Sequence, residues 1–203
     1  MASVVTICNL ALSRIGDRAS ISSIDPPDGS LQANACSRLY PIALASCLDM
    51  HNWSFATRRA KLAKLSYSGD KGDWLFAYAL PSDCRRVIDI KGEMPCHLFS
   101  HKEEFETVGE DFGMVLLTNA ENPSLRYITS EPKAAQFSGL FVDALAWLLA
   151  SYLAGETIRG DSAFNYGTKC LQQFSQTVAS AAQQDARLVH KQTRHVATWI
   201  SRR

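Results

Sequence analysis

The densest set of side chains that could do chemistry is an acidic segment in the middle of the chain. Within nine residues the sequence places five carboxylates, on Glu103, Glu104, Glu106, Glu110 and Asp111. A glycosidase needs two carboxylates about 5 to 9.5 Å apart, one as the acid and one as the nucleophile or base. Nothing in this spacing assigns those roles, and such acidic runs are typical of a solvated sheet edge or loop. A protein with glycan-hydrolase activity therefore stays an alternative, and we predict no catalytic residue here.

Other patterns for catalysis or metal binding are missing from the sequence. The six cysteines form no C-x-x-C pair, and no histidine stands at ligand spacing from them. There is no G-x-S-x-G elbow for a serine nucleophile and no G-x-x-x-x-G-K-[ST] loop for a phosphate. Cys8, Cys36, Cys47 and Cys170 lie on or beside predicted helix faces, which indicates small core residues. We predict a protein that is not an enzyme and that holds no cofactor and no metal.

A set of aromatic side chains could stack nucleic-acid bases: Trp53, Phe55, Trp74, Phe76 and Tyr78. Base-stacking surfaces are interleaved with Arg or Lys, whereas residues 74–80 carry no charge. Lys and Arg number 21 against 20 Asp and Glu, and this net charge of +1 excludes the basic excess of a dedicated nucleic-acid binder. We therefore predict that these aromatic residues pack in a core.

The N-terminal part of the chain has helical periodicity. Apolar residues from position 3 to position 15 fall on one helix face, with Ser3 as the N-cap and Gly16 as the C-terminal stop. Two prolines and a glycine in residues 21–30 predict a loop. A second helix begins at residue 30 or 31, and Pro41 predicts a kink or a break near Tyr40 because it lacks a backbone donor.

Helical periodicity returns near the C-terminus, at residues 137–152 and 164–182. The longest apolar run, from Leu140 to Leu153, is shorter than the ~18 residues of a membrane-spanning helix and contains Asp143. The N-terminus has no basic leader and no small-residue cleavage site. These features predict a protein that is kept reduced in the cytoplasm and has no membrane partner.

The middle third has short segments of alternating side chains between turn residues, which is the pattern of strands. The predicted strands are residues 74–80, 85–92, 96–100, 105–108, 113–120 and 124–131. The order of helices, strands and helices predicts an α+β fold. We expect an α-helical bundle of about four helices from residues 1–52 and 131–187. An antiparallel β unit, residues 53–130, is expected as an insertion between the second and third helices.

Residues 188–203 form a basic C-terminal arm. Together with Arg187 this tail has five cations and no carboxylate, so its charge of +5 is offset by −4 in the rest of the chain. The tail also contains apolar residues that a purely solvated segment would not need. The residues singled out are Arg187, Lys191, Arg194, Trp199, Ile200, Arg202 and Arg203.

Four strings resemble a known family in their order and spacing. They are ICNLALSRIG, CSRLYPIALASCLDMHNWSFATRRAKL, FAYALPSDCRRVIDIKG and VLLTNAENPSLRYITSEPKAAQFSGLFVDALAWLLASYLA. This succession, over about residues 3–185, resembles the bacteriophage tail tubular protein A family, whose members are head-to-tail adaptors of the phage neck. The residues that we take as structural members of the motifs are Leu39, Tyr40, Pro41, Trp53, Phe55, Leu80, Pro81 and Tyr127.

The resemblance implies a structural virion protein of the phage neck, present in the host cytoplasm during assembly. Such a protein forms a ring, commonly of twelve copies, that docks under the portal protein and extends the DNA channel. The helical bundle forms the body of the ring, and the β unit projects towards the downstream tail protein, a nozzle or tail tube. Genomic DNA passes through the lumen without sequence-specific binding, and a nearly neutral protomer suits such a conduit.

The arm allows two interpretations within this framework. In the first, it orders on docking to the portal protein and buries Trp199 and Ile200. In the second, its cations contact DNA phosphates, so that the neck protein binds DNA through its C-terminal arm. The sequence leaves both open.

Overall fold

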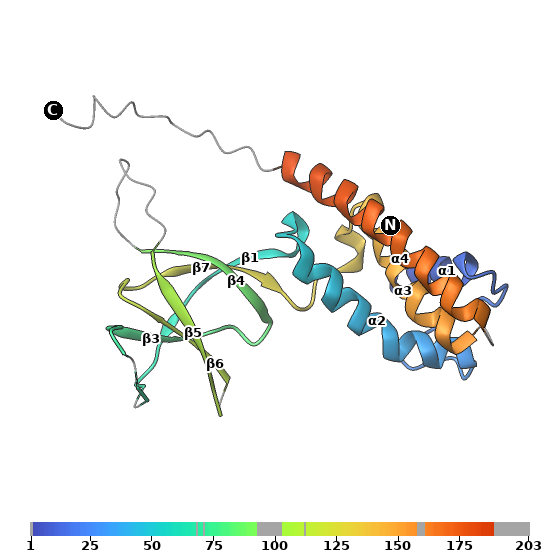
Figure 1. Ribbon diagram of the computed structural model, residues 1–203. Coiled ribbons are helices and arrows are strands. Elements are labelled where there is room, and N and C mark those ends of the chain that lie inside the picture. Colours follow the sequence, from blue (N-terminus) through green and yellow to red (C-terminus); the bar gives the residue numbers. More distant parts are fainter. Residues whose placement is uncertain are drawn as a thin grey trace, which may run out of the picture.

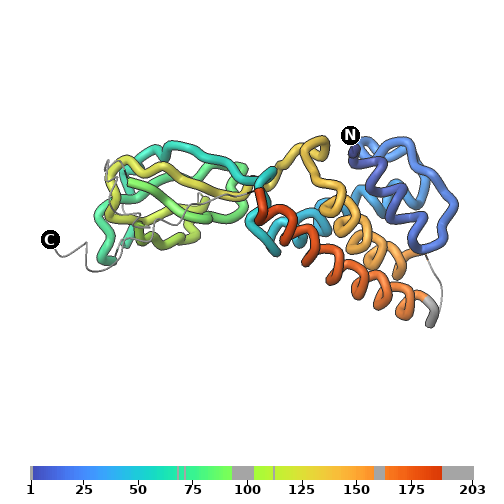
Figure 2. The backbone as a smooth tube through the Cα atoms, turned by 90° about the horizontal axis from the view of Figure 1, so that it is seen from above, coloured from blue at the N-terminus to red at the C-terminus, as the bar shows by residue number. Residues whose placement is uncertain are grey.

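The computed structural model describes residues 2–67, 69–70, 72–92, 103–111, 113–157 and 161–188. Within these residues the protein is α+β, with four α-helices and two antiparallel sheets (Figure 1). The helices are α1 (Val4–Arg14), α2 (Leu31–Met50), α3 (Gly139–Thr157) and α4 (Asp161–Arg187). The helices lie at one end of an elongated molecule and the strands at the other (Figure 2).

Local capping residues set the ends of α1. The Ser3 side chain accepts a hydrogen bond from the backbone N–H of Thr6 at 3.1 Å, which confirms the predicted N-cap. The C-cap residue is Ile15, and Gly16 follows it with a φ of 81°. A glycine adopts this left-handed conformation without a Cβ clash, so Gly16 ends the helix as predicted.

Helix α2 begins after its N-cap Ser30 and runs through Pro41 without interruption. Of the predicted kink or break near Tyr40, the break is therefore wrong and the kink stays a prediction. Pro41 is exposed, while Tyr40 and Ala43 on either side of it are buried in the helical core. Burial of side chains on both sides of the proline holds the helix together despite the missing backbone hydrogen bond.

Helix α3 is central and contacts α1, α2 and α4. Its Asp143 forms an ion pair with Arg14 of α1, and the Arg14 guanidinium lies 3.8 Å from the ring centroid of Trp147. With 19 residues, α3 is longer than the apolar run seen in the sequence, and by length and composition it is apolar enough to cross a membrane. Half of the tested window is buried inside the protein, and core helices pass the same test. The expected lack of a membrane partner therefore stays a prediction.

Side chains from all four helices share one hydrophobic core. Its fully buried large residues include Ile7, Leu12, Leu48, Trp53, Phe141, Leu145 and Leu149 of the helical end and Ile128 of the sheet. Helix α4 contributes Cys170, Phe174 and Ala181 to this core, and Val178 and Ala182 pack against it. The four helices thus make a single packed unit.

The strands form two sheets in which all neighbouring strands are antiparallel. The three-stranded sheet has the order β1 (Thr57–Lys61), β7 (Ser124–Thr129), β4 (Cys84–Lys91). The four-stranded sheet has the order β2 (Ala63–Lys64), β3 (Phe76–Ala79), β6 (Gly113–Thr118), β5 (Phe105–Glu110). The strand predicted at residues 96–100 lies outside the described residues.

The two sheets face each other across a second hydrophobic core. The four-stranded sheet contributes Tyr78 and Leu116, and the three-stranded sheet contributes Ile90, Leu125 and Tyr127. Because side chains alternate along a strand, the neighbours of these residues point to the outer faces of the sandwich. The predicted core packing of the aromatic residues is confirmed for Trp53 and Tyr78, which are 0% and 1% exposed.

Candidate functional site

The helices and the sheets meet at a cluster of aromatic side chains. Trp53 is fully buried, and its Nε1 donates a hydrogen bond to the carbonyl oxygen of Cys47 at 2.8 Å. Phe141 of α3 lies 4.8 Å from Trp53 and 4.7 Å from Phe55 between ring centroids. Phe137 closes the cluster at 5.1 Å from Phe55. These edge contacts fix the position of the chain where it passes from α2 into β1.

A buried carboxylate ties the end of α4 to the same junction. Asp185 is 5% exposed and accepts hydrogen bonds from the Ser54 backbone N–H at 2.9 Å and the Ser54 hydroxyl at 2.6 Å. The His51 Nε2 lies 3.4 Å from the same carboxylate. Asp185 was not predicted from the sequence, although its position four residues after Ala181 continues the buried face of α4.

A cavity of about 630 Å³ opens beside this junction. It is lined by His51, Asn52, Ser54, Thr57, Arg59, Ile88, Arg126 and Ala186. Arg126 is held by Asp89, with a distance of 3.0 Å from Nε to Oδ1. Arg59 is exposed and lies directly opposite Arg126 in the strand register. The cavity therefore has a cationic wall on the three-stranded sheet.

The acidic segment lies along β5, an edge strand of the four-stranded sheet. The Glu106 carboxylate accepts a hydrogen bond from Trp74 Nε1 at 2.9 Å, and the Glu110 carboxylate accepts one from the Tyr67 hydroxyl. The bond to Glu110 raises the pKa of Tyr67. Four steps of extended strand place the backbones of Glu106 and Glu110 about 13 Å apart, which is more than the carboxylate spacing of a glycosidase pair. Both carboxylates hold aromatic side chains on the outer face of the sheet.

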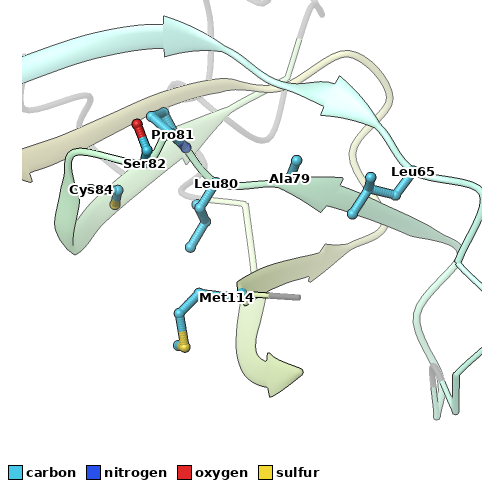
Figure 3. A pocket seen from close by; sticks show the side chains of 8 residues that line it. Leu65, Ala79, Leu80, Pro81, Ser82, Cys84 and Met114 are labelled. Atoms are coloured by element: carbon cyan, nitrogen blue, oxygen red, sulfur yellow. The ribbon is translucent and has the colours of Figure 1, made fainter. Parts of the chain in front are cut away.

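Two of the family-motif residues, Leu80 and Pro81, line a cavity of about 330 Å³ (Figure 3). The other lining residues are Leu65, Ala79, Ser82, Cys84, Gly113 and Met114. Leu80 and Met114 point into the same space in Figure 3. The lining is largely apolar and contains no group of acids or bases.

Tyr127 lies between the sheets, and its hydroxyl donates to the Asp83 carboxylate at 2.9 Å. Burial, with a further contribution from Asp83, raises the pKa of Tyr127 to about 12. The remaining motif residues Leu39, Tyr40 and Pro41 belong to α2. The family-motif residues are thus spread over the helical core, the junction and the sandwich, and they do not converge on one site.

The cysteines are packing residues in the described part of the chain. Cys8, Cys36, Cys47 and Cys170 are buried in the helical core, as predicted, and none is in a disulfide. Burial raises the pKa of the Cys47 thiol to about 12 and, together with Asp83, that of the Cys84 thiol to about 11. No group of three His, Cys, Asp or Glu among the described residues is placed to hold a metal ion.

Of the residues singled out in the predicted arm, the described part of the chain includes Arg187, which is exposed in the last turn of α4. The others, which are Lys191, Arg194, Trp199, Ile200, Arg202 and Arg203, lie outside the described residues. The chain matches no protein-family model and no curated protein.

Proposed function

We propose that the chain is a structural virion protein, a head-to-tail adaptor that forms a ring under the portal and extends the DNA channel into the tail. In this proposal the four helices form a bundle that makes the body of the ring. The β unit inserted between α2 and α3 projects towards the downstream tail protein. The protein needs no cofactor or metal and catalyses no reaction. The resemblance of its sequence to the tail tubular protein A family supports this function.

The observation that carries the proposal is a pair of apolar surfaces on α2 and α4 that are exposed among the described residues, with α3 between these two helices (Figure 1). On α2, Leu31 is 84% exposed and Ile42 is 55% exposed. They are separated by about three helical turns and therefore share one side of the helix. On α4, Phe164 is 79% exposed and Leu171 is 47% exposed, and about two turns separate them.

Two different apolar surfaces on one protomer suit a closed ring. Exposed apolar side chains that share a surface mark sites of protein association. A ring requires heterologous contacts, in which one surface of each copy meets a different surface of the next. In the proposed ring the apolar side of α2 packs against the apolar side of α4 of a neighbouring copy.

The outer side of α4 suits a DNA conduit. No charged residue occurs from position 170 to position 184, which is about 22 Å of helix. Gln172, Gln176 and Gln183 are exposed and point roughly opposite to the side that α4 buries. Each Lys or Arg that contacts a phosphate strengthens DNA binding, so an uncharged surface lets DNA slide. We place this side of α4 at the lumen of the proposed ring.

Assembly of surface variants tests the proposal. The variants Ile42→Asp and Phe164→Asp each put a charge into one proposed contact, and Gln183→Asp puts the same charge on the proposed lumen side. Sedimentation velocity of the folded proteins with the portal protein of the same phage should give rings for the wild type and Gln183→Asp. The two contact variants should stay monomeric. Rings of normal size from both contact variants would refute the proposed contact. A wild-type protein that stays monomeric and does not bind the portal protein would refute the adaptor function.

A further inference from the structure

The outer face of the three-stranded sheet carries a compact group of cations. Arg59 lies opposite Arg126 in the register. Two positions along β7, Lys61 and Lys91 both lie opposite Ser124. These four cations occupy two rows about 7 Å apart on strands about 4.8 Å apart. Asp89 forms an ion pair with Arg126, whereas no ion pair within the described residues involves the other three. We call these four cations the basic face.

The register also shows that the basic face points away from the sandwich core. Ala60, Ile90 and Leu125 alternate with its residues along β1, β4 and β7, and all three pack between the sheets. Arg59, Lys61 and Lys91 are exposed. Among the described residues, Arg59, Lys61 and Lys91 of the basic face are therefore free to contact another molecule.

The opposite outer face of the sandwich has an acidic edge along β5, beside an apolar cluster that contains Val115 and Leu117. Glu106 and Glu110 alternate along β5 with residues that face the four-stranded sheet's inner side, so their carboxylates lie on its outer side. Trp74 and Tyr67 hold these carboxylates by hydrogen bonds. Asp70 is exposed and lies in the connection between β2 and β3 that also carries Tyr67. We call Asp70, Glu106 and Glu110 the acidic face.

We propose that the basic face of one copy docks on the acidic face of the next copy around the ring. This inference rests on the proposed function, because it assumes that copies of the chain associate side by side. The two faces have opposite charge and lie on opposite sides of one sandwich, which is the arrangement a heterologous, ring-closing contact requires. Opposite potentials speed the encounter of the two surfaces and fix their register. The contact weakens as salt screens the exposed charges.

Charge reversal tests this contact in the full chain. The basic variant combines Arg59→Glu with Lys61→Glu, and the acidic variant combines Asp70→Lys with Glu106→Lys. The control combines Arg18→Glu with Lys133→Glu, which makes the same change in net charge as the basic variant at two exposed positions outside both faces. Ring formation is followed by sedimentation velocity with the portal protein present, at low and at high salt. Circular dichroism checks that each variant is folded.

Each reversal alone should weaken ring formation by about tenfold or more at low salt, and the control should assemble like the wild type. The chain with all four face substitutions should recover assembly, because the exchanged charges are complementary again. If the basic and acidic variants form rings at the same protein concentration as the wild type, the inference is overturned and the adaptor function still stands. Absence of any wild-type ring would overturn both. Unchanged rings together with a loss of duplex-DNA retention by the basic variant would assign the basic face to nucleic acid instead.

Discussion

The carboxylate of Asp185 accepts hydrogen bonds from both the backbone N–H and the hydroxyl of Ser54, although 131 residues separate the two. Asp185 lies near the end of α4, and Ser54 begins a short 3₁₀ turn, Ser54–Ala56, just before β1. The contact therefore joins the last helix to the entry of the sheets. In a ring built from identical copies, it helps every copy present its helices and its sandwich at the same angle.

Replacing Asp185 with Asn tests this link. The amide has nearly the same shape, but it cannot accept both hydrogen bonds without turning its NH₂ group towards the donors. Because the site is buried, we expect the free energy of unfolding to fall by about 1–3 kcal/mol. Urea denaturation measures this change. Gln184→Ala, on the exposed side of the same turn, serves as the control, and an unchanged urea midpoint for Asp185→Asn would contradict the assigned role.

Trp53→Phe tests the aromatic junction. The substitution removes the hydrogen bond to the Cys47 carbonyl and part of the ring that packs on Phe141. We expect a loss of about 2–4 kcal/mol in the free energy of unfolding. Trp74→Phe removes a hydrogen bond at a half-buried position and should cost less than about 1.5 kcal/mol. If urea denaturation gives equal losses in the free energy of unfolding for the two variants, the aromatic junction contributes no more to stability than the sandwich surface, which would contradict this prediction.

The raised pKa of Cys47 predicts how stability changes with pH. Burial raises this pKa from 9.0 to about 12, so between these values the folded protein keeps a proton that the unfolded chain releases. Stability is therefore fully present below pH 9 and falls as the pH rises towards 12, by up to about 1.4 kcal/mol per unit. Cys47→Ala should make this decline shallower. Urea denaturation at a series of alkaline pH values measures both slopes, and parallel slopes would contradict the prediction.

Deletion of residues 188–203 distinguishes the two interpretations of the arm. If the arm docks on the portal protein, the shortened chain should lose portal binding in a pull-down with purified portal. If the arm contacts DNA, portal binding should stay unchanged while salt-sensitive retention on duplex DNA falls. Unchanged binding to both would contradict both interpretations and leave the arm without a role in either contact.

The sequence predicted the elements that local residues determine. Ser3 and Gly16 mark the ends of α1 through their own backbone preferences. The alternating residues of β4, β6 and β7 predicted those strands, because one side of each strand packs between the sheets. By contrast, β1 and β2 were not predicted, since Arg58, Arg59, Lys61 and Lys64 interrupt the apolar alternation.

Features that depend on contacts between distant segments could not be predicted. The break expected at Pro41 does not occur because buried neighbours hold α2 together. The pairing of Asp185 with Ser54 depends on where α4 ends relative to β1. The basic face depends on the register of β1, β4 and β7, which brings together cations from three separate parts of the sequence. Such registers are set by packing and not by local propensity.

Native mass spectrometry of the chain with the portal protein that we propose as its partner tests the adaptor function most directly. At micromolar concentration we predict a complex in which a closed ring of copies, twelve in number, is bound to the portal protein. Each copy in that complex would contact two neighbours through different surfaces. A strictly monomeric chain that does not bind the portal at this concentration would contradict the proposed function.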